Sequence, residues 1–165
     1  MNIHILPTDK PSRLILQTNN KFRLSAIKFS GKIASGVTQH IYITSDEEIK
    51  EGDWVYSEQY KKILQFKLPS NKYFYKKIIL TTDQDLIKNG VQPIDDEFLE
   101  WFVKNPSCES VEIEQEILKL VHNPNYVNYT PEGDGIYLTP KSENLQYGET
   151  LIEDNVIDYK IIIPT

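Results

Sequence analysis

The sequence predicts an α+β fold that is mostly β: a bent antiparallel sheet or small partly open β-barrel, with one packed helix over about 95–104. Three observations predict it. Short runs of β-branched and aromatic residues alternate with clusters of Pro, Gly, Asn and Asp along most of the chain. Only one stretch spaces its apolar residues as a capped helix does. A length of 165 residues suits one domain, 1–165, with a sizeable core.

The first third of the chain predicts strands and a hairpin. Residues 1–6 alternate loosely and end at Pro7, which lacks the N–H that a strand ladder requires. Residues 13–29 predict a hairpin, because Asn19 and Asn20 tolerate the left-handed conformation of a tight turn. Two further strands are expected, at 40–43 and 54–56.

The middle of the chain predicts two more strands, 60–68 and 72–80, around the turn at 69–71. The segments 41–52 and 78–90 also share a pattern of strand, hydroxyl residues, Asp, aliphatic residue, Lys and Gly. Each copy predicts a strand whose end is capped by a hydroxyl or Asp side chain. One helical turn and a stop at glycine should follow.

The helix is expected to start at Asp95, because a carboxylate there accepts hydrogen bonds from the first turn. Phe98, Trp101 and Phe102 fall on one face and should pack beneath the curved sheet. Asn105 and the following proline end the helix.

After the helix, residues 110–116 alternate apolar residues with glutamates, as a half-buried strand does, and 117–121 extend the pattern. Residues of about 122–148 predict an irregular segment or a long hairpin, and 156–163 a closing strand. The predicted core comprises Ile41, Ile43, Trp54, Val55, Ile78, Leu80, Val111, Ile113, Ile161 and Ile163.

Charge and composition narrow the class of protein. The net charge is −6, but residues 1–40 hold six Lys/Arg and one Asp, whereas residues 41–165 hold 12 and 23. An acidic total argues against a general nucleic-acid binder, because phosphate contacts need a basic surface. The single cysteine and a start without a basic and apolar leader predict a reducing, cytoplasmic compartment. No membrane contact is expected, since the longest apolar runs fall far short of about 20 residues.

The strongest candidate for a ligand surface is the stretch from Tyr60 to Leu80, which holds six lysines, five aromatic residues and no acids. Lysines interleaved with aromatic rings suit single-stranded nucleic acid, which stacks its bases and presents phosphates. The same pattern also suits an ordinary hairpin with rings inward and lysines outward, and we favour that interpretation. The candidate residues are Tyr60, Lys61, Lys62, Lys67, Lys72, Tyr73, Tyr75 and Lys76.

Other chemistry-bearing residues are better explained by structure. The acids between 95 and 116 fit helix capping and a solvated strand face better than a catalytic pair. Cys108 follows a helix end, so no helix dipole activates its thiol. No metal site is expected from the three histidines, and no cofactor motif or catalytic residue is predicted. These residues are Asp95, Asp96, Glu97, Glu100, Glu109, Glu112, Glu114 and Glu116, with His4, His40 and His122.

Four stretches together resemble a family of uncharacterised proteins common in Bacteroidota, especially flavobacterial, genomes and in their phages and prophages. They are MNIHILPTDKPSRL, IYITSDEEIKEGDW, KKIILTTDQDLIKNGVQPIDDEFLEWFVKNPSCESVEIE and the terminal YKIIIP. The resemblance covers somewhat more than half the chain and both its ends. It implies a mobile-element origin and a location in the host-cell cytoplasm or in the virion, and it carries no activity, cofactor or functional residue to any position here.

The sequence thus favours a non-enzymatic, phage- or prophage-associated binding protein that acts through an unknown protein partner or self-association. The alternative is a nucleic-acid or nucleotide binder that uses the lysine and aromatic surface of 60–77. A hydrolase built on the acidic cluster is the third and weakest hypothesis.

Overall fold

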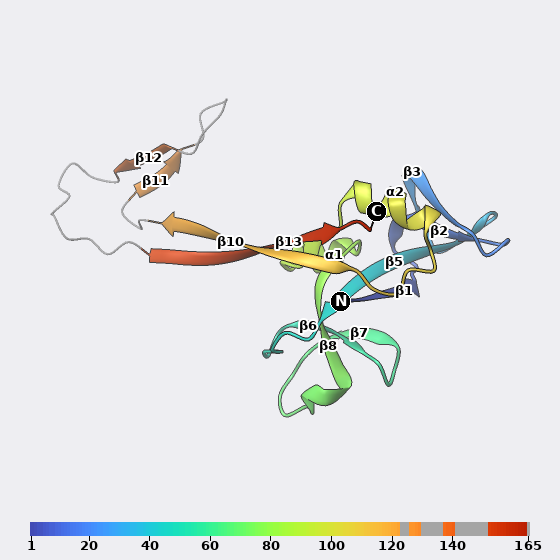
Figure 1. The fold of residues 1–165 in the computed structure, drawn as a ribbon, viewed down its shortest axis with the longest axis horizontal. Helices are drawn as coiled ribbons and strands as arrows, with labels where there is room; N and C mark the ends of the chain where they lie inside the picture. The colour runs from blue at the N-terminus through green and yellow to red at the C-terminus, as the bar shows by residue number, and fades with distance from the viewer. Residues whose placement is uncertain (123–125, 130–136, 141–151, 165) are drawn as a thin grey trace. The chain divides into compact units, whose positions relative to one another are not determined.

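The computed structural model describes the backbone of residues 1–122, 126–129, 137–140 and 152–164, and the side chains of 1–116 and 157–164. The chain forms two compact units. The first comprises Met1–Glu114 and Tyr159–Thr165, and the second comprises Gln115–Asp158. The large sheet and both α-helices lie in the first unit (Figure 1).

The large sheet curls into a half-barrel, which confirms the predicted α+β fold that is mostly β. Its main strand order is β3-β2-β5-β8-β6-β7, with β1 and β4 paired to β5 and β9 paired to β8. Its pairings are antiparallel except for the parallel pair β8–β9. The strands are β1 (Asn2–Pro7), β2 (Pro11–Gln17), β3 (Phe22–Ser30), β4 (Lys32–Ile33), β5 (Gly36–Ser45), β6 (Trp54–Ser57), β7 (Lys62–Gln65), β8 (Tyr75–Thr81) and β9 (Gln92–Pro93).

Strand β5 is the centre of this sheet, and every residue in it except Val37 is buried. One edge of β5 pairs with β4 and β1. The other edge pairs first with β2, over Gly36 to Gln39, and then with β8, over Tyr42 to Ser45. Between β2 and β8, Thr82 supplies the hydrogen bonds for the backbone of Ile41. Its Oγ1 accepts from the N–H of Ile41 at 2.9 Å. Its N–H in turn donates to the Ile41 carbonyl at 3.1 Å.

The predicted hairpin of residues 13–29 is present as β2 and β3. Asn20 adopts φ +61, the left-handed conformation expected at its turn. The strand β2 approaches β5 so closely that a Cβ on Gly36 would lie 2.1 Å from the Leu16 carbonyl oxygen. Only glycine fits there, which fixes where β2 meets β5.

The expected pairing of 60–68 with 72–80 is wrong. Strand β6 lies between β7 and β8 and pairs with both of them. Phe66 explains this arrangement, because it is buried with Ile49 and Val55 and its N–H donates to the Asp53 carbonyl at 2.7 Å. That contact extends the β6–β7 ladder, so the chain must cross to the far edge of β6. The crossing segment includes a 3₁₀ turn, η1 (Lys72–Phe74), where a strand was expected.

The expected helix is present as α2 (Asp96–Lys104), with Asp95 as its N-cap. The Asp95 carboxylate accepts from the Phe98 N–H at 2.7 Å. Phe98 and Phe102 are fully buried in the core against the sheet, as predicted. Trp101, expected in the same buried face, is only half-buried, because it lies toward the rim of that face.

The capped turn after β8 is also present, as α1 (Gln84–Lys88). Asp83 caps it and Gly90 follows at φ +96. In the earlier copy of the pattern, no helix forms between β5 and β6, although Gly52 has φ +91. There Asp46 pairs with Lys76 instead of capping a turn.

Most of the predicted core is buried, and the exceptions lie at its margin. Trp54, Ile113 and Ile163 are half-buried and pack against core clusters. The buried members are Ile41, Ile43, Val55, Ile78, Leu80, Val111 and Ile161. Val111 and Ile113 alternate with exposed Glu112 and Glu114, as the half-buried strand pattern predicted.

The last strands include one pair that runs beyond the first unit. Strand β10 (Glu112–His122) includes the expected extension and pairs with β13 (Ile152–Ile162). Gln92 joins β13 to the sheet, because its amide donates to the Tyr159 carbonyl at 2.7 Å and accepts from the Tyr159 N–H at 2.8 Å. Within 122–148, β11 (Tyr126–Tyr129) pairs with β12 (Tyr137–Pro140). The rest of that predicted segment lies outside the described residues.

No helix among the described residues is long and apolar enough to cross a membrane.

The packing of α2 predicts a contrast between two aromatic truncations. Phe102→Ala should lower the free energy of unfolding by about 3–5 kcal/mol, because it leaves a cavity in a fully buried core. Tyr73→Ala, at a ring that is 91% exposed, should change it by less than about 0.5 kcal/mol. Urea denaturation of both variants measures the difference. Equal costs would show that α2 does not cover the core.

Candidate functional site

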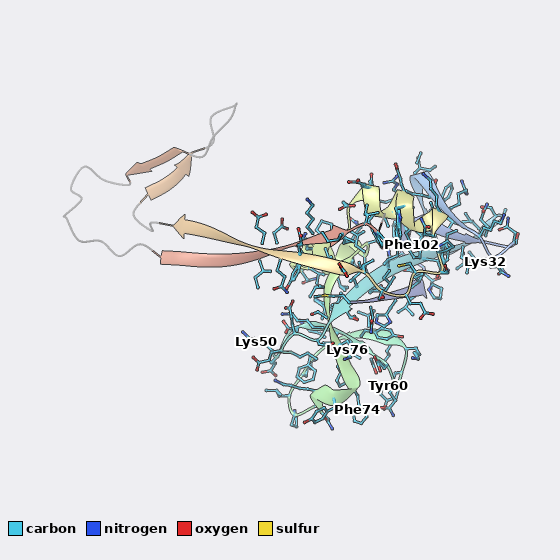
Figure 2. The ribbon with its side chains drawn as sticks, viewed as in Figure 1. Lys32, Lys50, Tyr60, Phe74, Lys76 and Phe102 are labelled. Atoms are coloured by element: carbon cyan, nitrogen blue, oxygen red, sulfur yellow. The ribbon has the colours of Figure 1, made fainter. Side chains whose placement is uncertain are left out.

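The surface predicted from the sequence forms one end of the first unit. We call residues 57–75, which link β6 to β8 and include β7, the aromatic lobe. Tyr60 is 60% exposed, Tyr73 91% and Phe74 53%, and Leu68 on the same segment is also exposed. Figure 2 shows Tyr60 and Phe74 at the same end of the unit. The hydrogen bond from the Glu58 N–H to the Phe74 carbonyl, 3.4 Å long, joins the segments that carry them.

The candidate residues divide between the exposed lobe and the interior. Tyr60, Lys61, Lys62, Lys67, Lys72 and Tyr73 are exposed. Tyr75 is half-buried and packs edge-on against Phe66, with ring centroids 5.7 Å apart. The neighbouring ring of Phe74, which was not among the candidate residues, is exposed to solvent. The ammonium of Lys62 lies 5.3 Å from the centre of the Tyr60 ring, a cation–π contact.

Acidic side chains from the segment between β5 and β6 border the lobe. Lys76 pairs with Asp46, and this hydrogen bond raises the pKa of Lys76 and lowers the pKa of Asp46. Lys72 lies 3.9 Å from Glu48. A hollow of about 260 Å³ between these two segments is lined by both acids and lysines. The lysines nearest the sheet are therefore held by carboxylates of the same chain.

The acidic residues of 95–116 cap the helix, pair with Arg13 or lie on the exposed surface. Asp95 caps α2, and Asp96 accepts a hydrogen bond from Arg13 at 2.7 Å. Glu97, Glu100, Glu109, Glu112, Glu114 and Glu116 are exposed. Among the described residues, no group of three His, Cys, Asp or Glu side chains is placed to hold a metal ion.

Three remaining candidates occupy separate positions. Cys108 is half-buried, and its thiol donates to the Ser110 carbonyl at 3.0 Å. His4 stacks on Tyr56 with ring centroids 3.9 Å apart and shares a 3.0 Å hydrogen bond with Thr44. Burial lowers the pKa of His4. The side chain of His122 lies outside the described part of the structure.

A polar cluster that sequence reasoning missed lies where the pairing of one edge of β5 passes from β2 to β8. His40 is 1% exposed, and its Nδ1 lies 3.1 Å from Thr82 Oγ1. The Tyr42 hydroxyl donates to the buried Asp83 carboxylate at 2.9 Å. Lys10 lies 2.5 Å from Asp85 and 3.8 Å from Asp83. The sequence signal was the capped turn after Thr82, but nothing in the sequence indicated that residues from about 10, 40 and 83 meet.

Burial sets the protonation states in this cluster. Burial lowers the pKa of His40, although the nearby Asp83 carboxylate opposes the shift, so the imidazole is neutral at pH 7. Burial and the Asp83 carboxylate both raise the pKa of Tyr42, which keeps its hydroxyl protonated as a donor. The hydrogen bond from Lys10 lowers the pKa of Asp85. At neutral pH the cluster thus holds neutral His40 and Tyr42 beside the ion pair of Lys10 with Asp85.

Comparisons with known proteins found no matching family model, no matching curated protein and no matching solved structure. Function is therefore argued from the geometry of the chain.

His40 predicts a loss of stability as the pH falls. Its pKa is below the ordinary 6.5 in the folded state, so between these two values the unfolded chain binds the extra proton. The contribution of His40 to the free energy of unfolding is then fully present above about pH 6.5 and is lost as the pH falls toward the pKa of the folded state. The charged groups facing the ring are Asp83, Lys10, Asp85 and Lys28.

Urea denaturation at several pH values between about 7 and 5 tests this linkage, with His40→Gln as the variant. The variant should show a shallower fall in unfolding free energy than the unsubstituted protein, because one titrating group is gone. His4 contributes in both proteins, so its effect cancels. Identical slopes would contradict the assignment of His40 as a buried neutral histidine.

Proposed function

We propose that this chain is a non-enzymatic binding protein whose aromatic lobe docks on a partner protein. The resemblance to proteins of Bacteroidota and their phages supports a phage or prophage setting for that partner. The single observation that carries the proposal is the exposure of Tyr60, Tyr73 and Phe74 on adjoining segments of one lobe.

Exposed aromatic rings of this kind suit protein recognition. Tyr and Phe expose large apolar areas at small entropic cost, and aromatic residues are enriched at the centres of interfaces. Tyr73 contributes nothing to the core at 91% exposure, so packing does not account for it. The neighbouring Leu68 is exposed on the same lobe and extends its apolar surface.

The charges around the rings favour a protein over a nucleic acid. Residues 57–75 carry four lysines and one glutamate, but Asp46, Glu47 and Glu48 border the lobe. These carboxylates pair with the inner lysines and so weaken the attraction of the lobe for a phosphate backbone, whereas an interface rim of mixed charge is ordinary for a protein partner. The partner's surface should accordingly be apolar at its centre and acidic where it meets Lys61, Lys62 and Lys67.

A single-stranded nucleic acid is the second candidate, and the Tyr60–Lys62 cation–π pair favours it. That pair places a charge beside an exposed ring, as stacking platforms for single strands do. Lys61 and Lys67 are exposed on the same lobe.

A photo-crosslinking amino acid placed at position 73 tests the protein partner. In extracts of phage-infected host cells it should give one discrete crosslinked species, because the lobe is expected to lie within the interface. The same probe at Ile27, an exposed apolar residue on β3, is the matched control and should give none. A crosslinked dimer of the chain would identify self-association. Identical patterns from both positions would overturn the role of the lobe.

The double variant Tyr73→Ser with Phe74→Ser should then weaken binding to the captured partner by about 2 kcal/mol or more, some thirtyfold in Kd. Since both rings are exposed, its melting temperature should stay near that of the unsubstituted protein. Competition between the two proteins for the crosslink measures the loss. Equal competition would contradict the proposal.

Fluorescence anisotropy with a labelled oligothymidine separates the alternative. A single-strand binder should bind it with an affinity that falls steeply with salt, and Lys61→Met with Lys67→Met should reduce the slope by roughly one unit. We expect no binding at physiological salt. Tight, salt-dependent binding that the Tyr73→Ser change weakens would favour nucleic acid over protein.

A further inference from the structure

A cavity of about 350 Å³ lies where the edge of β5 passes from β2 to β8. The two neighbouring strands diverge at this point, and side chains from four elements line the space between them. It shares no residue with the aromatic lobe, and its volume is in the range of small-molecule sites. Its polar lining comes from Lys10, Lys28, His40, Asp83, Asp85 and Lys88.

His40 lines this cavity and carries an unpaired polar atom. Its Nε2 is buried, and no residue in the described part of the chain offers it a hydrogen bond. The charged groups that act on the imidazole, Asp83, Lys10, Asp85 and Lys28, all line the cavity, so the ring lies beside it. A buried nitrogen without a partner destabilises the fold, and a ligand atom that accepts its hydrogen bond would remove that cost.

The tautomer of His40 follows from its neighbour. Thr82 Oγ1 already accepts a hydrogen bond from the Ile41 N–H at 2.9 Å, which leaves the hydroxyl proton to donate. Nδ1 lies 3.1 Å from this hydroxyl, and we assign the tautomer in which Nδ1 accepts its proton. Neutral His40 then carries its own proton on Nε2, where it is a donor and seeks an acceptor.

The carboxylates of the cavity are satisfied by their own chain. Asp83 accepts from the Tyr42 hydroxyl and from the Asp85 N–H at 3.0 Å. Asp85 is paired with Lys10. Lys28, from β3, and Lys88, from α1, line the cavity and form no ion pair with any other described residue. The remaining positive charge and the Nε2 donor both select an oxyanion.

A smaller cavity of about 140 Å³ adjoins this one and shares Pro11, Lys28 and Gln84 with it. Its lining includes Ile87, Ile94 and Leu99, from α1, β9 and α2 regions of the chain. An apolar group attached to the oxyanion would bury its surface there.

We propose that these two cavities bind a small organic oxyanion, a phosphate or carboxylate with an apolar or aromatic body. The oxyanion accepts from His40 Nε2 and pairs with Lys28 and Lys88, and the body lies against Ile87 and Ile94. This site is separate from the aromatic lobe and does not depend on its function.

NMR of the histidine rings tests the proposal with four probes: phenyl phosphate, benzoate, inorganic phosphate and phenol. Before any addition, the ring nitrogens of His40 should show the proton on Nε2. Phenyl phosphate or benzoate at millimolar concentration should shift the His40 signals and leave those of His4 in place. The stronger of the two identifies the oxyanion. Inorganic phosphate should bind more weakly, because it lacks the apolar body, and uncharged phenol should not shift His40.

Exposed lysines supply variants that leave the core intact. Lys28→Met and Lys88→Met should each raise the Kd of the preferred probe by about tenfold, since each removes one charge from the site. Lys50→Met is the matched control, an exposed lysine on the segment between β5 and β6, and should leave the Kd unchanged within about twofold.

Three results would overturn the proposal. An absence of any His40 shift with all four probes would mean that the cavity takes only water. An equal effect of Lys50→Met would mean that the anion binds the surface without a specific site. A proton on Nδ1 of His40 would remove the donor on which the choice of an oxyanion rests.

Discussion

The fold depends on one strand whose two edges must both be paired. β5 is buried along almost its whole length, so each of its N–H and C=O groups needs a partner. β1 and β4 supply partners on one edge. On the other edge β2 and β8 share the task, and Thr82 bonds Ile41 where neither strand reaches. The cavity beside His40 lies at this change of partner.

This arrangement separates the two surfaces that we consider functional. At one end of the first unit, the turn from β6 to β7 leaves Tyr60 outside the core, and the crossing from β7 to β8 leaves Tyr73 and Phe74 outside it. Beside the centre of β5, where its pairing passes from β2 to β8, a cavity is lined by buried His40 and Asp83 and by exposed lysines. The lobe is suited to a large partner and the cavity to a small one, and they can act independently because they share no residue.

Charge pairing distinguishes the two surfaces as well. Around the lobe, carboxylates of 46–48 neutralise the inner lysines and leave the outer ones available. In the cavity, Lys10 and the Tyr42 hydroxyl satisfy Asp85 and Asp83, so Lys28 and Lys88 stay without an ion pair among the described residues. In both places the carboxylates are paired with nearby lysines, so the net negative charge of the whole chain does not determine the charge of the local surface.

Local sequence determined what depends on neighbouring residues. The hairpin turn at Asn20, the Asp95 cap of α2, the burial of Phe98 and Phe102 and the alternation of Val111 with Glu112 all follow from spacing and turn chemistry. The exposed members of the lobe, such as Tyr60 and Lys61, were also found by composition.

Only the tertiary structure decided that β6 separates β7 from β8, that Tyr75 turns inward while Phe74 faces solvent, and that His40 meets Asp83 and Lys10. These contacts join residues far apart in the chain, and one strand can pair with several partners that suit its pattern equally well. Which partner it takes is settled by the packing of the whole sheet, and no short stretch of sequence contains that information.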